Sequence, residues 1–382
     1  MAEAFIVGAV RTPVGKRNGG LSAVHPADMA AHVLTELIAR TAADPAAIDD
    51  VIMGCVSQIG PQSVDIARTA WLSAGLPENV PGVTIDRQCG SSQQAVHFAA
   101  QAVLSGTQDL VVAAGVESMS MVPMGSTVAL PLEKGMAPPF GQGWRDRYGD
   151  QEISQFRGAQ LICEKWGLKR LQLEEFSLES HARAVNAIDE GRFDREITPV
   201  AGVTTDEGPR RDTTLEKMAE LKPLREGWEL TAATASQISD GAAAVLIASE
   251  AALQRYGLTP RARLHALTVV GADPVFMLTG PIPATEQALA RGQLVIDDID
   301  VFEVNEAFAP VLLAWSADTG ASLEKTNPNG GAIALGHPLG ATGAILMTKL
   351  LHELERIEGR YGLQTMCEGG GQANATIIER LA

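Results

Sequence analysis

The sequence predicts an α/β fold built from two similar halves. Strand-like and helix-like segments alternate in the first third, which favours parallel strands covered by helices. This alternation of strand-like and helix-like segments, the texture of the sequence, is lost between about residues 117 and 232 and returns after residue 240. At 382 residues the chain is long for a single core, so two lobes around a middle insertion are expected. The repeat is one of texture only, because no letter-by-letter repeat is strong enough to prove a duplication.

Each element of the first third follows from its apolar pattern. Short apolar, β-branched runs predict buried strands, and apolar residues three or four positions apart predict a helix face, as at Met29, Val33 and Leu37. The expected elements are, in order, a strand at 4–10, a helix at 28–40, strands at 51–56 and 83–85, a helix at 92–106 closed by Gly106, and a strand at 109–115.

The middle of the chain has a different character. Residues 119–144 are rich in Met, Pro and Gly and show no helical or strand period, which is typical of a functional loop or cap. Helical patterns return at 155–190. The later segments are an arginine-bearing stretch at 208–224, a helix at 283–292, a strand followed by a helix at 298–315, and a closing strand pair at 362–381.

Composition and charge exclude several classes of function. The formal net charge of −16 argues against nucleic acid or an anionic membrane as partner, although a local basic patch could still bind a small anion. The four cysteines are scattered without a C-x-x-C pair, so neither a disulfide framework nor a metal site is expected. The N-terminal residues resemble no signal or transit peptide, and we expect a cytoplasmic protein.

Cys89 stands between an expected strand and an expected helix. The N–H groups at a helix N-terminus favour a thiolate, which is the nucleophilic form needed for covalent catalysis. Ser91 and Ser92 are candidate N-caps of that helix. Free cysteines are commonly small buried hydrophobes, so this alternative stays open for Cys89. Cys55 and Cys163 lie inside apolar segments and fit that alternative better.

His337 is the histidine with an unusual context. It lies in a glycine-rich block at 327–344 whose glycines allow a ligand to approach the backbone closely, and Pro338 stiffens the following turn. The glycine spacing superficially resembles a phosphate loop but lacks the terminal Lys-Ser/Thr. His337 is therefore a candidate base for a nucleophilic cysteine, with a helix cap as the alternative.

Two further positions carry candidate chemistry. Cys367 precedes three glycines whose N–H groups could form an oxyanion hole, although three glycines can also make a tight turn. Asn305 follows an expected strand, where its amide could hold a water or a carbonyl oxygen. The alternative is an ordinary cap on a helix beginning at Glu306.

The motifs taken together, in their order and spacing, resemble the thiolase family over the whole chain. They are RTPVGK (11–16), CGSS (89–92), GVESMS (115–120), RRDTTLEKMAELKP (210–223), SDGAAA (239–244), NEAFAP (305–310), GGAIALGHPLGATGA (330–344) and CEGGG (367–371). The resemblance implies the five-layered α-β-α-β-α thiolase fold, made from two duplicated halves. It places an N-terminal half at 1–116, an inserted loop domain for coenzyme A (CoA) binding and oligomerisation at 117–240, the end of the N-terminal half at 241–265 and a C-terminal half at 266–382.

The resemblance also implies a role for each candidate residue. Cys89 would accept the acyl group, and His337 would activate it and line one oxyanion hole, in which Asn305 holds a water. Cys367 would be the general acid and base at the substrate α-carbon. The N–H groups of Gly369 and Cys89 would form a second hole for the acyl-enzyme. These parts suffice for thiolytic cleavage of a 3-ketoacyl-CoA.

The implied partners are acyl-CoA and CoA, with CoA as co-substrate and no permanently bound cofactor. Arg210 and Ser236 match family positions that touch CoA, the arginine near its adenine end. The family forms dimers that commonly pair into tetramers, so we expect a homodimer or homotetramer. Similar variants, including the TMCEGGG spelling, look like an actinobacterial branch that degrades fatty acids or steroid side chains and rings.

The chain departs from the family pattern near the reactive centre and the expected acyl pocket. These departures put the acyl-chain specificity in doubt, and they are Asp86, the run Ser92–Gln94, Phe156, Ala233 and Glu368.

Several rival functions share parts of this pattern. Ketosynthases and hydroxymethylglutaryl-CoA synthases share the fold but lack a second cysteine before a glycine triplet, so Cys367 argues against them. The sterol-carrier type uses a different histidine motif. A biosynthetic thiolase running the Claisen condensation would use the same residues, and a non-catalytic acyl-CoA-binding scaffold would have lost one of them.

Overall fold

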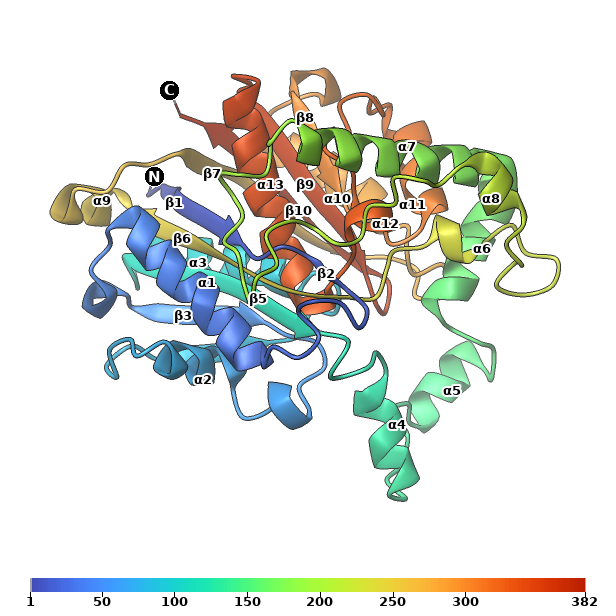
Figure 1. Cartoon of the computed structure of the whole chain (residues 1–382), viewed down its shortest axis with the longest axis horizontal. Helices are drawn as coiled ribbons and strands as arrows, with labels where there is room; N and C mark the ends of the chain where they lie inside the picture. The colour runs from blue at the N-terminus through green and yellow to red at the C-terminus, as the bar shows by residue number, and fades with distance from the viewer. Residues whose placement is uncertain (1, 382) are drawn as a thin grey trace.

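The computed structural model describes residues 2–381 and shows one mixed sheet with helices on both faces (Figure 1). The strand order is β4-β3-β5-β6-β1-β7-β10-β9-β8, with the short β2 paired to β6. The strands are β1 (Ala4–Arg11), β2 (Gly15–Lys16), β3 (Asp50–Gly54), β4 (Gly82–Ile85), β5 (Leu110–Ser118), β6 (Ser239–Ser249), β7 (Ala262–Gly271), β8 (Val301–Val304), β9 (Tyr361–Glu368) and β10 (Gln372–Arg380).

The sheet consists of two halves with the same internal order. In the first half the run is β3-β5-β6-β1, and in the second it is β8-β9-β10-β7. Each half contains a corresponding parallel pair of strands. The pair is β3 with β5 in the first half and β8 with β9 in the second. The halves join where Phe5 and Ile6 pair with Arg263 and Ala262. This shared order supports the duplication that the recurring texture suggested.

Helices divide the molecule into five layers. On the outer side of the first half-sheet lie α1 (Pro26–Thr41) and α2 (Ile66–Ser73). Between the half-sheets lie α3 (Ser91–Leu104) and α13 (Thr342–Arg356), which contact each other. The helix α13 packs on strands of both halves, and α3 packs on the first half and reaches β10 through a hydrogen bond from Gln93 to Thr376. On the outer side of the second half-sheet lie α10 (Pro281–Gly292) and α11 (Ala309–Thr319). The predicted α-β-α-β-α arrangement is confirmed.

The middle insertion runs between β5 and β6 and contains α4 (Ser126–Glu133), α5 (Gln142–Tyr148), α6 (Gln155–Trp166), α7 (Arg170–Asp189) and α8 (Leu215–Ala219). Figure 1 shows α4 and α5 projecting away from the layers. The expectation of no periodic structure at 119–144 is wrong, because two short helices form there. They are hard to recognise because Pro131 lies inside α4 and glycines precede both helices.

Short elements complete the fold: α9 (Glu250–Tyr256), α12 (Ala332–Leu335) and the 3-10 turns η1 (Pro45–Ala47), η2 (Gly60–Gln62), η3 (Ala232–Thr234), η4 (Ile296–Asp298) and η5 (Leu339–Ala341). Among the described residues, no helix is long and apolar enough to cross a membrane. A buried ion cluster ties the insertion to β1, since Arg11 donates to Glu196 at 2.7 Å and to Asp206 at 2.7 Å.

Candidate active site

A tight turn between β4 and α3 presents Cys89. Asp86 accepts a hydrogen bond from the Gln88 N–H at 2.6 Å, and Gln88 adopts a left-handed φ of 49°. Ser91 Oγ accepts from the Arg87 N–H at 2.9 Å and donates to the Gln88 carbonyl at 2.6 Å. The prediction that Ser91 or Ser92 is the N-cap is wrong: Gly90 is the cap, and Ser91 instead closes the turn.

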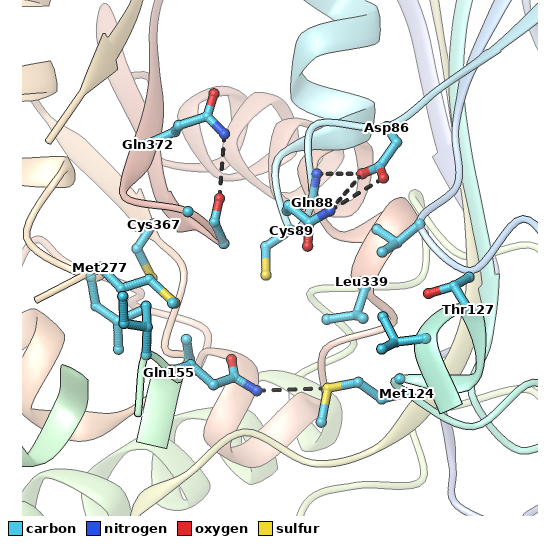
Figure 2. A pocket seen from close by; sticks show the side chains of 18 of the residues that line it. Asp86, Gln88, Cys89, Met124, Thr127, Gln155, Met277, Leu339, Cys367 and Gln372 are labelled. Carbon is cyan, nitrogen blue, oxygen red and sulfur yellow. Dashed lines mark hydrogen bonds between the residues drawn. The ribbon is translucent and has the colours of Figure 1, made fainter. Parts of the chain in front are cut away.

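Cys89 opens onto a large cavity with a volume of ≈ 560 Å³. Figure 2 shows its sulfur pointing into the open centre, with Cys367 to one side and Leu339 to another. Met124 and Gln155, which come from the insertion, close the cavity at a third side. The further apolar lining residues are Val56, Val128, Phe140, Trp144, Ile153, Met277, Leu278 and Ala307. A cavity of this size and composition suits a sizeable apolar group.

Cys367 reaches the same cavity from the end of β9, followed by the glycine turn at 369–371. Gly370 and Gly371 adopt φ values of 82° and 74°, so these glycines do form a tight turn. Gly369 and Gly370 nevertheless line the cavity, and the Gly369 N–H interacts with the Cys89 sulfur. The turn and the oxyanion-hole interpretations are thus both compatible with the same backbone.

Both cysteines rest as thiols at neutral pH. The pKa of Cys89 is raised to about 12, first by burial and then by the Glu368 carboxyl, against the opposing effect of the N–H groups of Cys89 and Gly369. Burial, then Cys89 and then Glu368 raise the pKa of Cys367 well above its ordinary range. The backbone N–H groups favour the thiolate of Cys89, as expected, but the loss of solvation outweighs them.

His337 and Asn305 form a buried pair. His337 Nδ1 lies 2.6 Å from Thr342 Oγ1, whose own hydrogen is donated to the Pro338 carbonyl at 2.8 Å. Since that hydrogen is used, we infer that Nδ1 carries the ring hydrogen and donates it to Thr342. Nε2 is then an acceptor, 3.3 Å from Asn305 Nδ2. Burial lowers the pKa of His337 to about 4, so the ring is neutral.

The pair stands just behind the cavity wall. Ala307 and Leu339, each two residues beyond a member of the pair, line the cavity, whereas His337 and Asn305 do not. Within residues 2–381 no hydrogen bond joins Cys89 to His337. The helix after Asn305 begins at Ala309, so the alternative of a cap on a helix beginning at Glu306 is wrong.

Sequence reasoning gave no role to Glu117, which fixes the loop after His337. This buried carboxylate accepts from the N–H groups of Val56 at 2.9 Å, Ser57 at 3.1 Å and Gly340 at 2.9 Å, and from Gln62 Nε2 at 2.8 Å. It thereby connects β5 to the loops on both sides of the cavity. The GVESMS motif contains Glu117, and a charged residue at the end of an apolar strand is the signal that could have identified it.

Arg210 lies in a second cavity of ≈ 210 Å³ with Lys217, His181 and Ala233. Ser236 does not line it, although the Ser236 N–H donates to the Ala307 carbonyl at 2.9 Å. Since Ala307 lines the first cavity and Ala235 the second, one short segment separates the two.

The departures from the family pattern lie in different surroundings. Asp86 lines the first cavity and Ala233 the second. Phe156 lines neither and packs edge-on against Phe308, and Gln93 bonds to Thr376 at 2.8 Å, inside the core. The departures were expected near the acyl pocket or the reactive centre, and Asp86 is the one among them that lines the first cavity.

Comparison with known proteins decides the family. The model "Thiolase, N-terminal domain" matches residues 4–251, and "Thiolase, C-terminal domain" matches residues 258–380. The chain belongs to the thiolase family. As a thiolase it is an acyltransferase.

Similar proteins include steroid 3-ketoacyl-CoA thiolase FadA6 of Mycobacterium tuberculosis, 60% identical over 100% of this chain and 95% of that protein. A β-ketoadipyl-CoA thiolase of Pseudomonas aeruginosa is 43% identical over 99% of both chains. Among solved structures, human mitochondrial 3-ketoacyl-CoA thiolase in complex with CoA is 35% identical, with a TM-score of 0.90 and full coverage of both chains. The expected likeness to an actinobacterial degradative branch is confirmed by the first relative.

Proposed function

We propose that this thiolase cleaves a 3-ketoacyl-CoA with a bulky apolar acyl group, using CoA to release acetyl-CoA or propionyl-CoA and a shortened acyl-CoA. The observation that carries the proposal is the placement of Cys89 and Cys367 in one large apolar cavity, next to a second cavity that contains Arg210 and Lys217. The relatives that act on steroid and 3-ketoacyl thioesters support the degradative direction.

The first half-reaction transfers the acyl group to the enzyme. The Cys89 sulfur attacks the C3 ketone while its proton moves to Nε2 of His337, the unprotonated ring nitrogen. The C2–C3 bond then breaks, and its electron pair forms the enolate of the departing acyl-CoA. The imidazolium N–H of His337 and a water held by Asn305 stabilise that enolate oxygen, and Cys367 protonates C2.

The second half-reaction returns the acyl group to CoA. The Cys367 thiolate removes the proton from the CoA thiol, which attacks the acyl carbon on Cys89. The N–H groups of Cys89 and Gly369 hold the oxyanion. Collapse breaks the C–S bond, and the Cys89 sulfur recovers the proton from His337. His337 thus returns the proton of Cys89, the proton that Cys367 gave to C2 is replaced by that of the CoA thiol, and the cycle closes.

CoA binding is assigned to the second cavity and the segment beside it. Arg210 and Lys217 supply positive charge in a protein whose net charge is −16, which suits the phosphates of CoA. Ser236 lies where the pantetheine arm would pass from this cavity toward Cys89. No group of three His, Cys, Asp or Glu among the described residues is arranged to hold a metal ion, and this chemistry uses none.

A homodimer or homotetramer is proposed on two surface features. The segment from α4 to α5 exposes apolar side chains, including Leu130 in α4 and Met136 and Phe140 between the two helices, and β4 is an edge strand with Val83 exposed. Exposed apolar patches and open sheet edges are typical of association surfaces. The division at 1–116, 117–240, 241–265 and 266–382 and a cytoplasmic location stay predictions. Light scattering after gel filtration measures the assembly.

The activity is tested by thiolysis with CoA and three thioesters: acetoacetyl-CoA, a long-chain 3-ketoacyl-CoA and a polycyclic 3-ketoacyl-CoA. We expect the highest kcat/KM with a bulky substrate, and no cleavage by Cys89→Ala. Preference for acetoacetyl-CoA would favour the biosynthetic condensation, which the same residues catalyse. CoA binding without cleavage of any thioester would favour the non-catalytic scaffold.

A further inference from the structure

Glu368 is a buried carboxyl group that the reaction above does not use. It follows Cys367 on β9, and alternation along the strand directs it away from the cavity. Its carboxyl group occupies the space where a side chain at Gly90 would begin, immediately behind the Cys89 turn. Glu368 therefore lies beside both cysteines without lining the substrate cavity.

The Glu368 carboxyl lacks the partners that a buried charge needs. Both of its oxygens are without a hydrogen bond among the described residues, in contrast to Glu117, which has four donors. Arg87 faces it, but its NH1 is bonded to Gln372 at 2.8 Å and its Nε is also unpartnered. An unpaired charge in such surroundings is costly, which favours the protonated carboxyl.

The groups around Glu368 come from three elements. The turn before α3 contributes Arg87 and Cys89, β9 contributes Cys367, and β10 contributes the neutral Asn374. The pKa of Glu368 is raised to about 8 because burial outweighs the opposing charge of Arg87. A negative charge on Glu368 and a negative charge on either cysteine therefore disfavour each other.

We propose that Glu368 controls the ionisation of the catalytic cysteines, which form thiolates readily only while this carboxyl remains protonated. Because a like charge disfavours ionisation, a Glu368 carboxylate makes each thiolate harder to form. Glu368 is a positioning residue and not a catalytic one. It acts through the ionisation of Cys89 and Cys367 and touches no substrate. The inference rests on the proposed function for the roles of those two residues.

The test measures the ionisation of Cys89 directly. The rate of iodoacetamide alkylation at Cys89 is followed between about pH 6 and pH 10.5, with peptide mass mapping to separate the four cysteines. Glu368→Gln keeps the size of the side chain and cannot ionise. Above the pH at which Glu368 loses its proton, we expect this variant to be alkylated about tenfold faster than wild type, a displacement of about one pH unit.

Two controls separate the local charge from other effects. Glu324→Gln removes one exposed carboxylate from the loop after α11 and should leave the profile unchanged. Glu368→Met, which also removes the charge, should follow Glu368→Gln. The wild-type profile provides a test without any variant: its rate should rise by less than tenfold per pH unit while Glu368 ionises, and resume its full slope above that.

Identical profiles for wild type and Glu368→Gln would overturn the inference. If both variants failed to fold, a wild-type profile of constant slope would overturn it, and the expected inflection would support it. Alkylation requires no turnover, so the outcomes are independent. A chain with the expected profiles but no thiolysis would refute the proposed function alone.

Discussion

Thr342 determines which nitrogen of His337 can accept a proton, and its replacement by valine is the most informative perturbation. The Thr342 hydroxyl accepts from His337 Nδ1 at 2.6 Å and donates to the Pro338 carbonyl at 2.8 Å. Valine has the same shape but leaves the buried Nδ1–H without a partner. An unpaired buried donor costs about 1–3 kcal/mol. If this cost falls on the reactive tautomer, kcat/KM decreases by about 5- to 160-fold.

Thr348→Val is a closely matched control on the same helix. Thr348 is also buried, and its hydroxyl donates to the carbonyl four residues earlier, that of Ala344, at 2.8 Å. It makes no contact with His337, so this variant should lose the same kind of hydrogen bond and retain its kcat/KM. Steady-state thiolysis and thermal unfolding are measured for both variants. Equal kcat/KM values for Thr342→Val and Thr348→Val would refute the assignment of the His337 tautomer.

Three further predictions concern the backbone, the co-substrate and pH. Gly340→Ala should abolish soluble expression or lower the free energy of unfolding by several kcal/mol, because the new Cβ would lie 2.6 Å from the Cα of Cys55. Gly141→Ala is the control, since a Cβ there meets nothing within 4 Å and should be tolerated. Arg210→Ala should raise KM for CoA about tenfold at unchanged kcat, whereas Arg211→Ala, which loses only a surface ion pair, should not. The pKa of Glu368 is raised on folding to about 8, so the native state retains a proton that the unfolded chain releases. The stability that this proton contributes is fully present below the unfolded pKa and is lost as pH rises toward about 8. Urea unfolding should therefore show Glu368→Gln gaining stability relative to wild type between pH 5 and pH 9. A difference in stability that stays constant over this range would contradict the prediction.

The layers of the fold could be predicted from the sequence because local apolar patterns determine them. The strand at 4–10 and the helix at 28–40 are found as β1 and α1, each extended by one or two residues at its ends. The helices α4 and α5 could not be predicted, since neither has a fully buried side chain that would impose a core-facing apolar pattern on its sequence.

The site could be predicted in its members but not in its electrostatics. Cys89 stands in a recognisable turn and Cys367 just before one, and both reach one cavity. Their protonation depends on burial and on Glu368, which only the three-dimensional packing reveals. The role of Glu117 is also visible only in the three-dimensional packing, because its four hydrogen-bond donors lie 55 to 223 positions away in the sequence.

The central claim is that Cys89 carries the acyl group, and trapping that intermediate tests it most directly. Wild type is mixed with a 3-ketoacyl-CoA in the absence of free CoA, quenched in acid and digested for peptide mass mapping. We predict one acyl group on the peptide containing Cys89, its loss when CoA is added before the quench, and no acylation in folded Cys89→Ala. Acylation of Cys367 instead, or thiolysis by Cys89→Ala, would contradict the account.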